Sequence, residues 1–238
     1  MSAVQAFFDA FPFMASHLAL LLSQTVQFLE IVGVAVGIAW VLACPLGILL
    51  GHWHRGEFIG INLANVARAL PTPAIIAILL VFVGIGFTNI VIALIVAGIP
   101  PILLSAYTGI DQVPADVVES ARGVGMSEWQ LLLRIEVPLA MPLLFGGLRT
   151  AVVFIIGTAP LAALIGGQGL GVIIVNQPSF GLDGVIAATL WVAALAVGAD
   201  LGLGLVERAL TPKTLRRSRS REHRQDGVSY EVGNFEIV

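Results

Sequence analysis

The sequence predicts an all-α, polytopic membrane protein with about five transmembrane helices and a helix–glycine–helix segment outside the bilayer. Composition is the first basis: 58% of the residues are hydrophobic and only 11% are charged, which a soluble domain of this length does not show. Length is the second, because the apolar runs reach the roughly 20 residues that a helix needs to cross a bilayer. The third is a polar segment, residues 111–138, that interrupts these runs.

We expect residues 1–24 to form an extracytoplasmic or interfacial segment. They contain aromatic residues, Pro12 and a single acid, Asp9, but neither Lys nor Arg, and a secretory signal peptide would need a basic start. Residues 14–23 are apolar enough to form a sixth, tightly turned span. No Gly or Pro separates them from the next helix, so six spans are the alternative to five.

The transmembrane part is predicted to cover residues 25–210. Its spans have the approximate limits Thr25–Leu50, Ile59–Gly84, Ile90–Gly109, Leu139–Ile165 and Val185–Ala209. In the second span, Pro71 and Pro73 flank Thr72, remove backbone donors and kink the helix. Such a kink is tolerable at membrane depth only where the opened backbone is buried in protein or faces a cavity. We therefore predict that Pro71, Thr72 and Pro73, with Pro100 of the third span, belong to a pathway through the membrane.

Three features that look like binding sites are interpreted as structural. His52 and His54 are too few and too close together for a metal site without other ligands, so we place them at the membrane surface and predict no metal site. The glycine-rich run 166–171 has no lysine nearby and does not follow the nucleotide-binding fingerprints, which favours a tight extracytoplasmic turn. Cys44, the one cysteine, lies in an apolar run and is expected to be a packing residue.

The polar segment 111–138 reads as two short helices around a glycine. Pro114 suits the first position of a helix, and Gly125 is expected to break that helix in a conformation closed to residues with a β-carbon. Ser127, followed three residues later by Gln130, forms a capping box that starts a second helix. This second helix should stop before Pro138.

The spacing in this segment resembles the EAA loop of the membrane subunits of bacterial ABC importers. The residues on pattern are Glu119, Ala121, Gly125, Ile135 and Pro138, while Ser120 and Val137 are small or apolar replacements. In that family the loop is a cytoplasmic knob that docks into a groove of the ATPase subunit. The resemblance implies an ATPase-coupling role for Glu119, Ala121, Arg122, Gly125, Trp129, Ile135 and Pro138.

Beyond the loop, the chain resembles the permeases of quaternary-ammonium osmoprotectant importers, which carry glycine betaine, choline or carnitine. The further matching stretches are 69–74, Gly109-Ile110 and 166–171. The resemblance implies the ABC type I importer permease fold, a second permease that is identical or paralogous, two ATPase subunits and a separate extracytoplasmic solute-binding protein. The alternatives are a permease for another small solute, such as methionine or another amino acid, and a non-transport membrane scaffold.

The basic residues predict the orientation in a bacterial cytoplasmic membrane. Of the 12 Lys and Arg, seven lie from Arg208 onward, and the others are Arg55, Arg68, Arg122, Arg134 and Arg149. By the positive-inside rule, the Arg55 turn, the polar segment and the C-terminus are cytoplasmic, while the N-terminus and the glycine-rich loop lie outside. The tail 211–238 is expected to be disordered and to fix this topology rather than bind nucleic acid.

An ATPase or another enzyme is not predicted. The only lysine, Lys213, follows a proline, whereas a Walker A loop needs Gly-Lys-Ser/Thr. No acid–base pair or activated nucleophile stands out in the spans. We expect no cofactor in this chain, with ATP bound by a partner subunit.

Two charges inside the predicted spans are expected to meet. Arg149 and Asp200 each lie about ten residues from the cytoplasmic end of their span, which places both roughly 15 Å deep. An isolated charge there costs at least about 2.5 kcal/mol. We predict that Arg149 and Asp200 pair as a structural clamp between the fourth and fifth spans; protonation of Asp200, or contacts of Arg149 with backbone carbonyls or the cytoplasmic surface, are the alternatives.

Overall fold

The computed structural model describes residues 3–53 and 71–210, and all regular structure in these ranges is helical. The α-helices are α1 (Ala3–Ser16), α2 (Leu18–His52), α4 (Thr72–Val83), α5 (Phe87–Asp111), α6 (Ala115–Gly123), α7 (Glu128–Leu131), α8 (Val137–Thr158), α9 (Gly171–Val175) and α10 (Gln177–Leu210). A π-helical turn, η1 (Leu132–Glu136), precedes α8, and a 3₁₀ segment, η2 (Ala159–Ile165), follows it.

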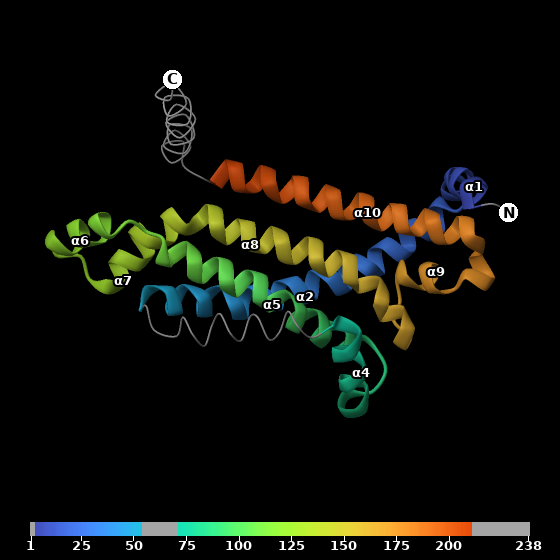
Figure 1. Cartoon of the computed structure of the whole chain (residues 1–238), viewed down its shortest axis with the longest axis horizontal. Helices are drawn as coiled ribbons and strands as arrows, with labels where there is room; N and C mark the ends of the chain where they lie inside the picture. The colour runs from blue at the N-terminus through green and yellow to red at the C-terminus, as the bar shows by residue number, and fades with distance from the viewer. Residues whose placement is uncertain (1–2, 54–70, 211–238) are drawn as a thin grey trace, which may run out of the picture.

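The long helices form a bundle along the long axis of the molecule (Figure 1). Four stretches of the described chain are long and apolar enough to cross a membrane, Leu18–His52, Phe87–Asp111, Glu128–Ile165 and Gln177–Ala209, and α4 is a shorter apolar helix. The α6–α7 hairpin lies at one end of the bundle, and α1 and α9 lie at the other (Figure 1). The predicted membrane fold is therefore confirmed.

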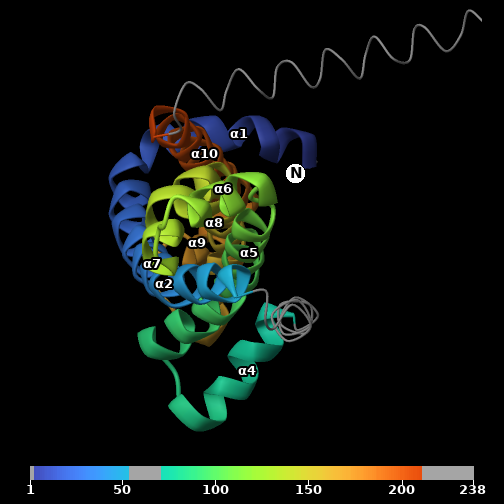
Figure 2. The same cartoon turned by 90° about the vertical axis from the view of Figure 1, so that its left-hand side faces the viewer.

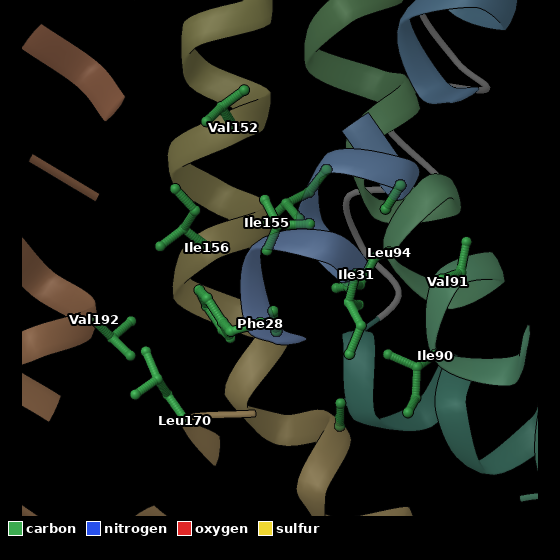
Figure 3. Close-up of a cluster of buried hydrophobic side chains, with 14 of the residues drawn as sticks. Phe28, Ile31, Ile90, Val91, Leu94, Val152, Ile155, Ile156, Leu170 and Val192 are labelled. Atoms are coloured by element: carbon green, nitrogen blue, oxygen red, sulfur yellow. The ribbon is translucent and has the colours of Figure 1, made fainter. Parts of the chain in front are cut away.

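The core lies between α2, α5, α8 and α10. Phe28, Leu94 and Ile155 are each no more than 2% exposed, and Figure 3 shows these and neighbouring apolar side chains gathered between the helices. Small residues let the backbones approach closely: a β-carbon on Gly47 of α2 would lie 2.6 Å from the carbonyl oxygen of Leu103 in α5. Membrane helices associate through such close packing, because lipid is as apolar as their side chains.

The alternative of a sixth span over residues 14–23 is wrong. Residues 14–16 end α1, and residues 18–23 begin α2, which starts before the predicted limit at Thr25. α1 has 14 residues, about 21 Å of helix, which is too short to cross a bilayer. It leaves the axis of α2 because Ala10 and Phe13 pack against Ala187 of α10, and no glycine or proline is needed for this turn.

Only the second half of the predicted span Ile59–Gly84 lies in the described residues. Pro71 is the extended residue that precedes α4, with φ −66° and ψ 131°, and Pro73 lies in the first turn, where a missing N–H costs nothing. Ile75 and Ile76 pack against Ala93 of α5, while the rest of α4 diverges from the bundle (Figure 2). The first half of this span, with Ala69-Leu70 of the proline motif, lies outside the described residues, as do His54, Arg55, Arg68 and the tail 211–238.

The last two spans start earlier than expected. The fourth runs from Glu128 rather than Leu139, and it ends as predicted at Ile165, where the 3₁₀ segment η2 meets Gly166 with φ +77°. The fifth was expected to start near Val185, but α10 begins at Gln177, with a non-helical kink at Gly181. Helix and kink coexist there because glycine adopts φ +69° without a β-carbon clash.

Candidate coupling site and intramembrane charges

The first half of the polar segment folds as predicted except at its start. α6 begins at Ala115, and Pro114 is the extended residue before it rather than the first helical residue. At the other end Gly125 has φ +86°. Its N–H donates to the carbonyl of Arg122 (2.9 Å), and the N–H of Met126 donates to that of Ala121 (3.2 Å). This pair of bonds is a Schellman motif, so a left-handed glycine ends α6.

The second half begins with the predicted capping box. The Gln130 N–H donates to Ser127 Oγ (3.4 Å), and the Ser127 N–H donates to Gln130 Oε1 (3.1 Å). The prediction that this helix stops before Pro138 is wrong. The Val137 N–H bonds to the carbonyl of Leu132, five residues back, and the wider π turn places Pro138 in the first turn of α8, where proline is tolerated. The second helix of the hairpin is therefore continuous with the long apolar helix α8.

The residues that the resemblance assigns to coupling divide into two groups. Glu119, Arg122, Gly125 and Trp129 are exposed, Trp129 by 63%. Ala121 is buried, and Ile135 and Pro138 are half-buried. Two further apolar side chains of this segment are exposed, Val124 by 81% and Leu133 by 63%. The first group and these two side chains are accessible from outside the chain, whereas the second group packs within it; a coupling role for the seven residues stays a prediction.

An ion pair joins the two arms of the hairpin. Arg122 Nε and Nη2 donate to the two carboxylate oxygens of Glu128, each at 3.1 Å. This hydrogen-bonded carboxylate raises the pKa of the Arg122 guanidinium. Arg122 therefore holds α6 against α7, in addition to any contact outside the chain.

A buried contact that the sequence analysis missed ties the hairpin to α2. His52 Nδ1 lies 2.6 Å from Glu136 Oε2, and the two side chains are only 5% and 6% exposed. His52 Nε2 also lies 3.5 Å from Glu128 Oε2. Glu136 itself was the signal in the sequence that could have predicted this contact. It is an acid between Ile135 and Val137 at the start of a transmembrane helix, where an uncompensated charge is costly. His52 is thus a buried link between α2 and η1, and its predicted place at the membrane surface stays a prediction.

The structure brings Arg149 and Asp200 together. Arg149 of α8 donates from Nε and Nη2 to the two carboxylate oxygens of Asp200 in α10. The side chains are 38% and 33% exposed. The predicted contact between the spans is present, and its role as a clamp stays a prediction.

The predicted pathway residues lie in different surroundings. Thr72 is 6% exposed and Pro100 is less than 2% exposed, so both are buried inside the chain. Pro71 and Pro73 are exposed at the start of α4. A pathway role for these four residues, and the expectation that the Thr72 region faces a second permease, stay predictions.

Comparison with known families decides the class of the protein. Residues 43–212 match the family described as "Binding-protein-dependent transport system inner membrane component". The chain belongs to this family. It is therefore a permease, the polytopic inner-membrane subunit of an ABC importer that works with an ATP-binding subunit, and the alternative of a non-transport scaffold is wrong.

Relatives cover nearly the whole permease. It is 36% identical over 201 residues to the glycine betaine/carnitine/choline transport system permease protein OpuCB of Bacillus subtilis, covering 82% of this chain and 91% of the relative. It is 35% identical over 202 residues to the choline transport system permease protein OpuBB of the same organism, covering 83% and 91%. It is 34% identical over 220 residues to the osmoprotectant import permease protein OsmW of Salmonella typhimurium, covering 87% and 100%.

A solved structure supports the fold. A chain of the inward-facing MetNI methionine ABC transporter aligns with a TM-score of 0.71 at 19% identity, covering 83% of this permease and 99% of that chain. At this identity the similarity concerns the fold alone. The permease therefore has the ABC type I importer fold that its coupling loop implied.

Proposed function

We propose that the permease forms the translocation pathway for a quaternary-ammonium osmoprotectant such as glycine betaine, choline or carnitine. The observation that carries this proposal is the 34–36% identity, over more than four fifths of the chain, to permeases named for these solutes. The coupling hairpin supports the transport cycle, since its outer face is exposed and its root is continuous with α8.

The proposed assembly contains a second permease, identical or paralogous, two ATPase subunits and a separate extracytoplasmic solute-binding protein. ATP would bind the partner subunits, and this chain would have no ATPase site and no cofactor. The N-terminus would face outside, and the hairpin and C-terminus would face the cytoplasm. The arrangement in Figure 1 supports this orientation, because α1 lies at one end of the bundle and α6 and α7 lie at the other.

Coupling would follow from the contacts at the base of the hairpin. A displacement of α7 by the ATPase reaches α8 directly, because only the η1 turn separates them. The His52–Glu136 contact carries the same displacement to α2. Two membrane helices would thus move together when the ATPase changes shape.

A permease for methionine or another amino acid is the second candidate. The fold shared with the MetNI transporter permits it, but a shared fold does not imply a shared solute.

The test is uptake by the permease reconstituted into proteoliposomes with its ATPase and solute-binding protein. We expect ATP-dependent accumulation of radiolabelled glycine betaine, choline or carnitine, and none of methionine. Accumulation of methionine alone would establish the second candidate. Absence of any uptake, by a complex whose ATPase is stimulated by its binding protein loaded with some other solute, would overturn both.

A further inference from the structure

A small cavity lies in the bundle far from the coupling hairpin. It has a volume of 210 Å³ and lies between α2, the start of α5 and the glycine-rich loop, where its polar and aromatic lining is Gln27, Glu30, Phe87 and Gln168. Glu30 precedes His52 by 22 residues along α2, about 33 Å of helix axis. That distance is close to the roughly 30 Å thickness of a bilayer core, which places the cavity near the membrane surface opposite the hairpin.

Glycines of two loops form part of the cavity wall. Gly86 has φ +133° and Gly166 has φ +77°, and a β-carbon on Gly167 would lie 2.6 Å from the carbonyl oxygen of Ala162. The Gly169 N–H donates to Gln24 Oε1 of α2 (3.0 Å), which ties the glycine-rich loop to the helix that carries Glu30. The backbone contacts of the glycine-rich loop therefore fix the shape of the cavity.

Glu30 gives the cavity a negative charge. Its side chain is exposed and makes no hydrogen bond or ion pair with any residue in the described ranges. The sequence has no Lys or Arg before Arg55, between Arg68 and Arg122, or between Arg149 and Arg208, so the segments that border the cavity supply no counter-ion. A carboxylate near the bilayer is stabilised by water or by a cation, and a cation is the ligand that it favours.

The other lining groups favour an organic cation. The Phe87 side chain is 47% exposed, and the face of an aromatic ring attracts an alkylammonium group. Divalent metal ions need several oxygen ligands in a defined arrangement, and this cavity offers one carboxylate and two amide side chains. A methylated ammonium group is bound by a charge and an aromatic face without a full set of oxygen ligands.

We propose that this cavity is an entry subsite of the permease for the quaternary-ammonium group of the solute, with Glu30 as the counter-charge and Phe87 as the aromatic wall. This inference rests on the proposed function and deepens it, because it gives the permease its own contact with the solute after release from the binding protein. The uptake of choline, a cation, should depend on Glu30 more than the uptake of glycine betaine does, because Glu30 also repels the carboxylate of glycine betaine.

The test uses the complete transporter in proteoliposomes with saturating loaded binding protein. We expect Glu30→Gln to lower the rate of choline uptake at least about tenfold, as for a lost charge-assisted contact, and the rate of glycine betaine uptake less. Glu30→Asp should restore part of the choline rate, and Phe87→Leu should lower both rates. Asp9→Asn is the matched control: it removes an exposed carboxylate from α1, outside the cavity lining, and should leave both rates unchanged.

A direct binding measurement completes the design. Saturation-transfer NMR on the purified transporter without binding protein should detect choline at millimolar concentration in the wild type and not in Glu30→Gln, and co-purification of the ATPase with each variant shows that it is folded. Wild-type uptake of quaternary amines with unchanged rates in Glu30→Gln and Phe87→Leu would overturn the subsite and leave the proposed function intact. Displacement of choline by equimolar Na⁺ or Mg²⁺ would overturn it in favour of an inorganic cation site. Failure of the wild type to carry any quaternary amine would overturn the proposed function, and the subsite with it.

Discussion

At the scale of single residues, two positions in this permease have surroundings that few residue types fit. Gly125 ends α6 at a positive φ, and Glu136 is buried with one imidazole as its close partner. Gly125 lies in the hairpin, and Glu136 lies at its base, where η1 leads directly into α8.

Replacing Gly125 with valine should abolish transport while the protein still inserts into the membrane. An L-residue with a β-carbon pays roughly 1–2 kcal/mol in the left-handed region, and valine pays more than asparagine because it is branched. Uptake in proteoliposomes and the amount of membrane-inserted protein are the two measurements. Gly125→Asn is the control and should retain most activity; normal uptake by Gly125→Val at normal expression would refute the assignment of Gly125 to coupling.

Replacing His52 with alanine should uncouple ATP hydrolysis from uptake. The change leaves the Glu136 carboxylate buried without its imidazole, at a cost of about 1–3 kcal/mol, and it frees α2 from η1. We expect uptake to fall severalfold while the ATPase activity of the assembled complex is retained. The double variant His52→Ala/Glu136→Gln should lose less than the sum of the single variants, since the two side chains form one contact; strict additivity would contradict the link.

At the scale of elements, the permease is held together by pairs of helices with matched surfaces. α2 packs on α5 through glycine and alanine, α1 packs on α10 through Ala10, Phe13 and Ala187, and α8 is joined to α10 by the Arg149–Asp200 pair. The apolar contacts set how closely the helices approach. The ion pair gives each of two charged side chains a partner, since an isolated charge inside the membrane is costly.

Removing one charge of the α8–α10 pair should reduce the yield of folded protein. Asp200→Asn leaves the Arg149 guanidinium without its carboxylate at membrane depth, where an isolated charge costs at least about 2.5 kcal/mol. Yield after detergent extraction and gel filtration measures the effect. Combining Asp200→Asn with Arg149→Gln should restore the yield, and a double variant as poor as Asp200→Asn alone would show that the two side chains do not act as a unit.

At the scale of the whole molecule, the two ends of the bundle carry different elements (Figure 1). The hairpin, on which Glu119, Val124 and Trp129 are exposed, projects from one end (Figure 1). The glycine-rich loop and α1 lie at the opposite end (Figure 1). In the proposed function, this polarity would let an ATPase on one side of the membrane act on a solute that enters from the other.

Reversing the charge of Glu119 should prevent assembly without unfolding the permease. Glu119 is exposed on α6, so Glu119→Lys changes the docking surface and leaves the core intact. We expect loss of ATPase co-purification and of uptake, with normal membrane insertion. Asp9→Lys, a charge reversal at the other end of the bundle, is the control and should co-purify normally; full uptake by Glu119→Lys would refute the docking surface.

The sequence by itself determined the membrane class, the approximate positions of the long spans and the turn chemistry of the hairpin. These properties are local: apolar length sets a span, a glycine accepts φ +86°, and a serine three residues before a glutamine caps a helix. The contact of Arg149 with Asp200 was also predictable, because matched depth and the cost of an isolated charge leave few partners.

Only the tertiary structure decided the features that depend on distant segments. α1 turns away from α2 because it packs against α10, and the second helix of the hairpin continues past Pro138 because a π turn widens the helix there. His52 meets Glu136 across 84 residues of sequence, and three separate segments enclose the cavity with Glu30. Such contacts depend on how whole helices pack, and packing is set by the shapes of both partners rather than by the sequence of either one.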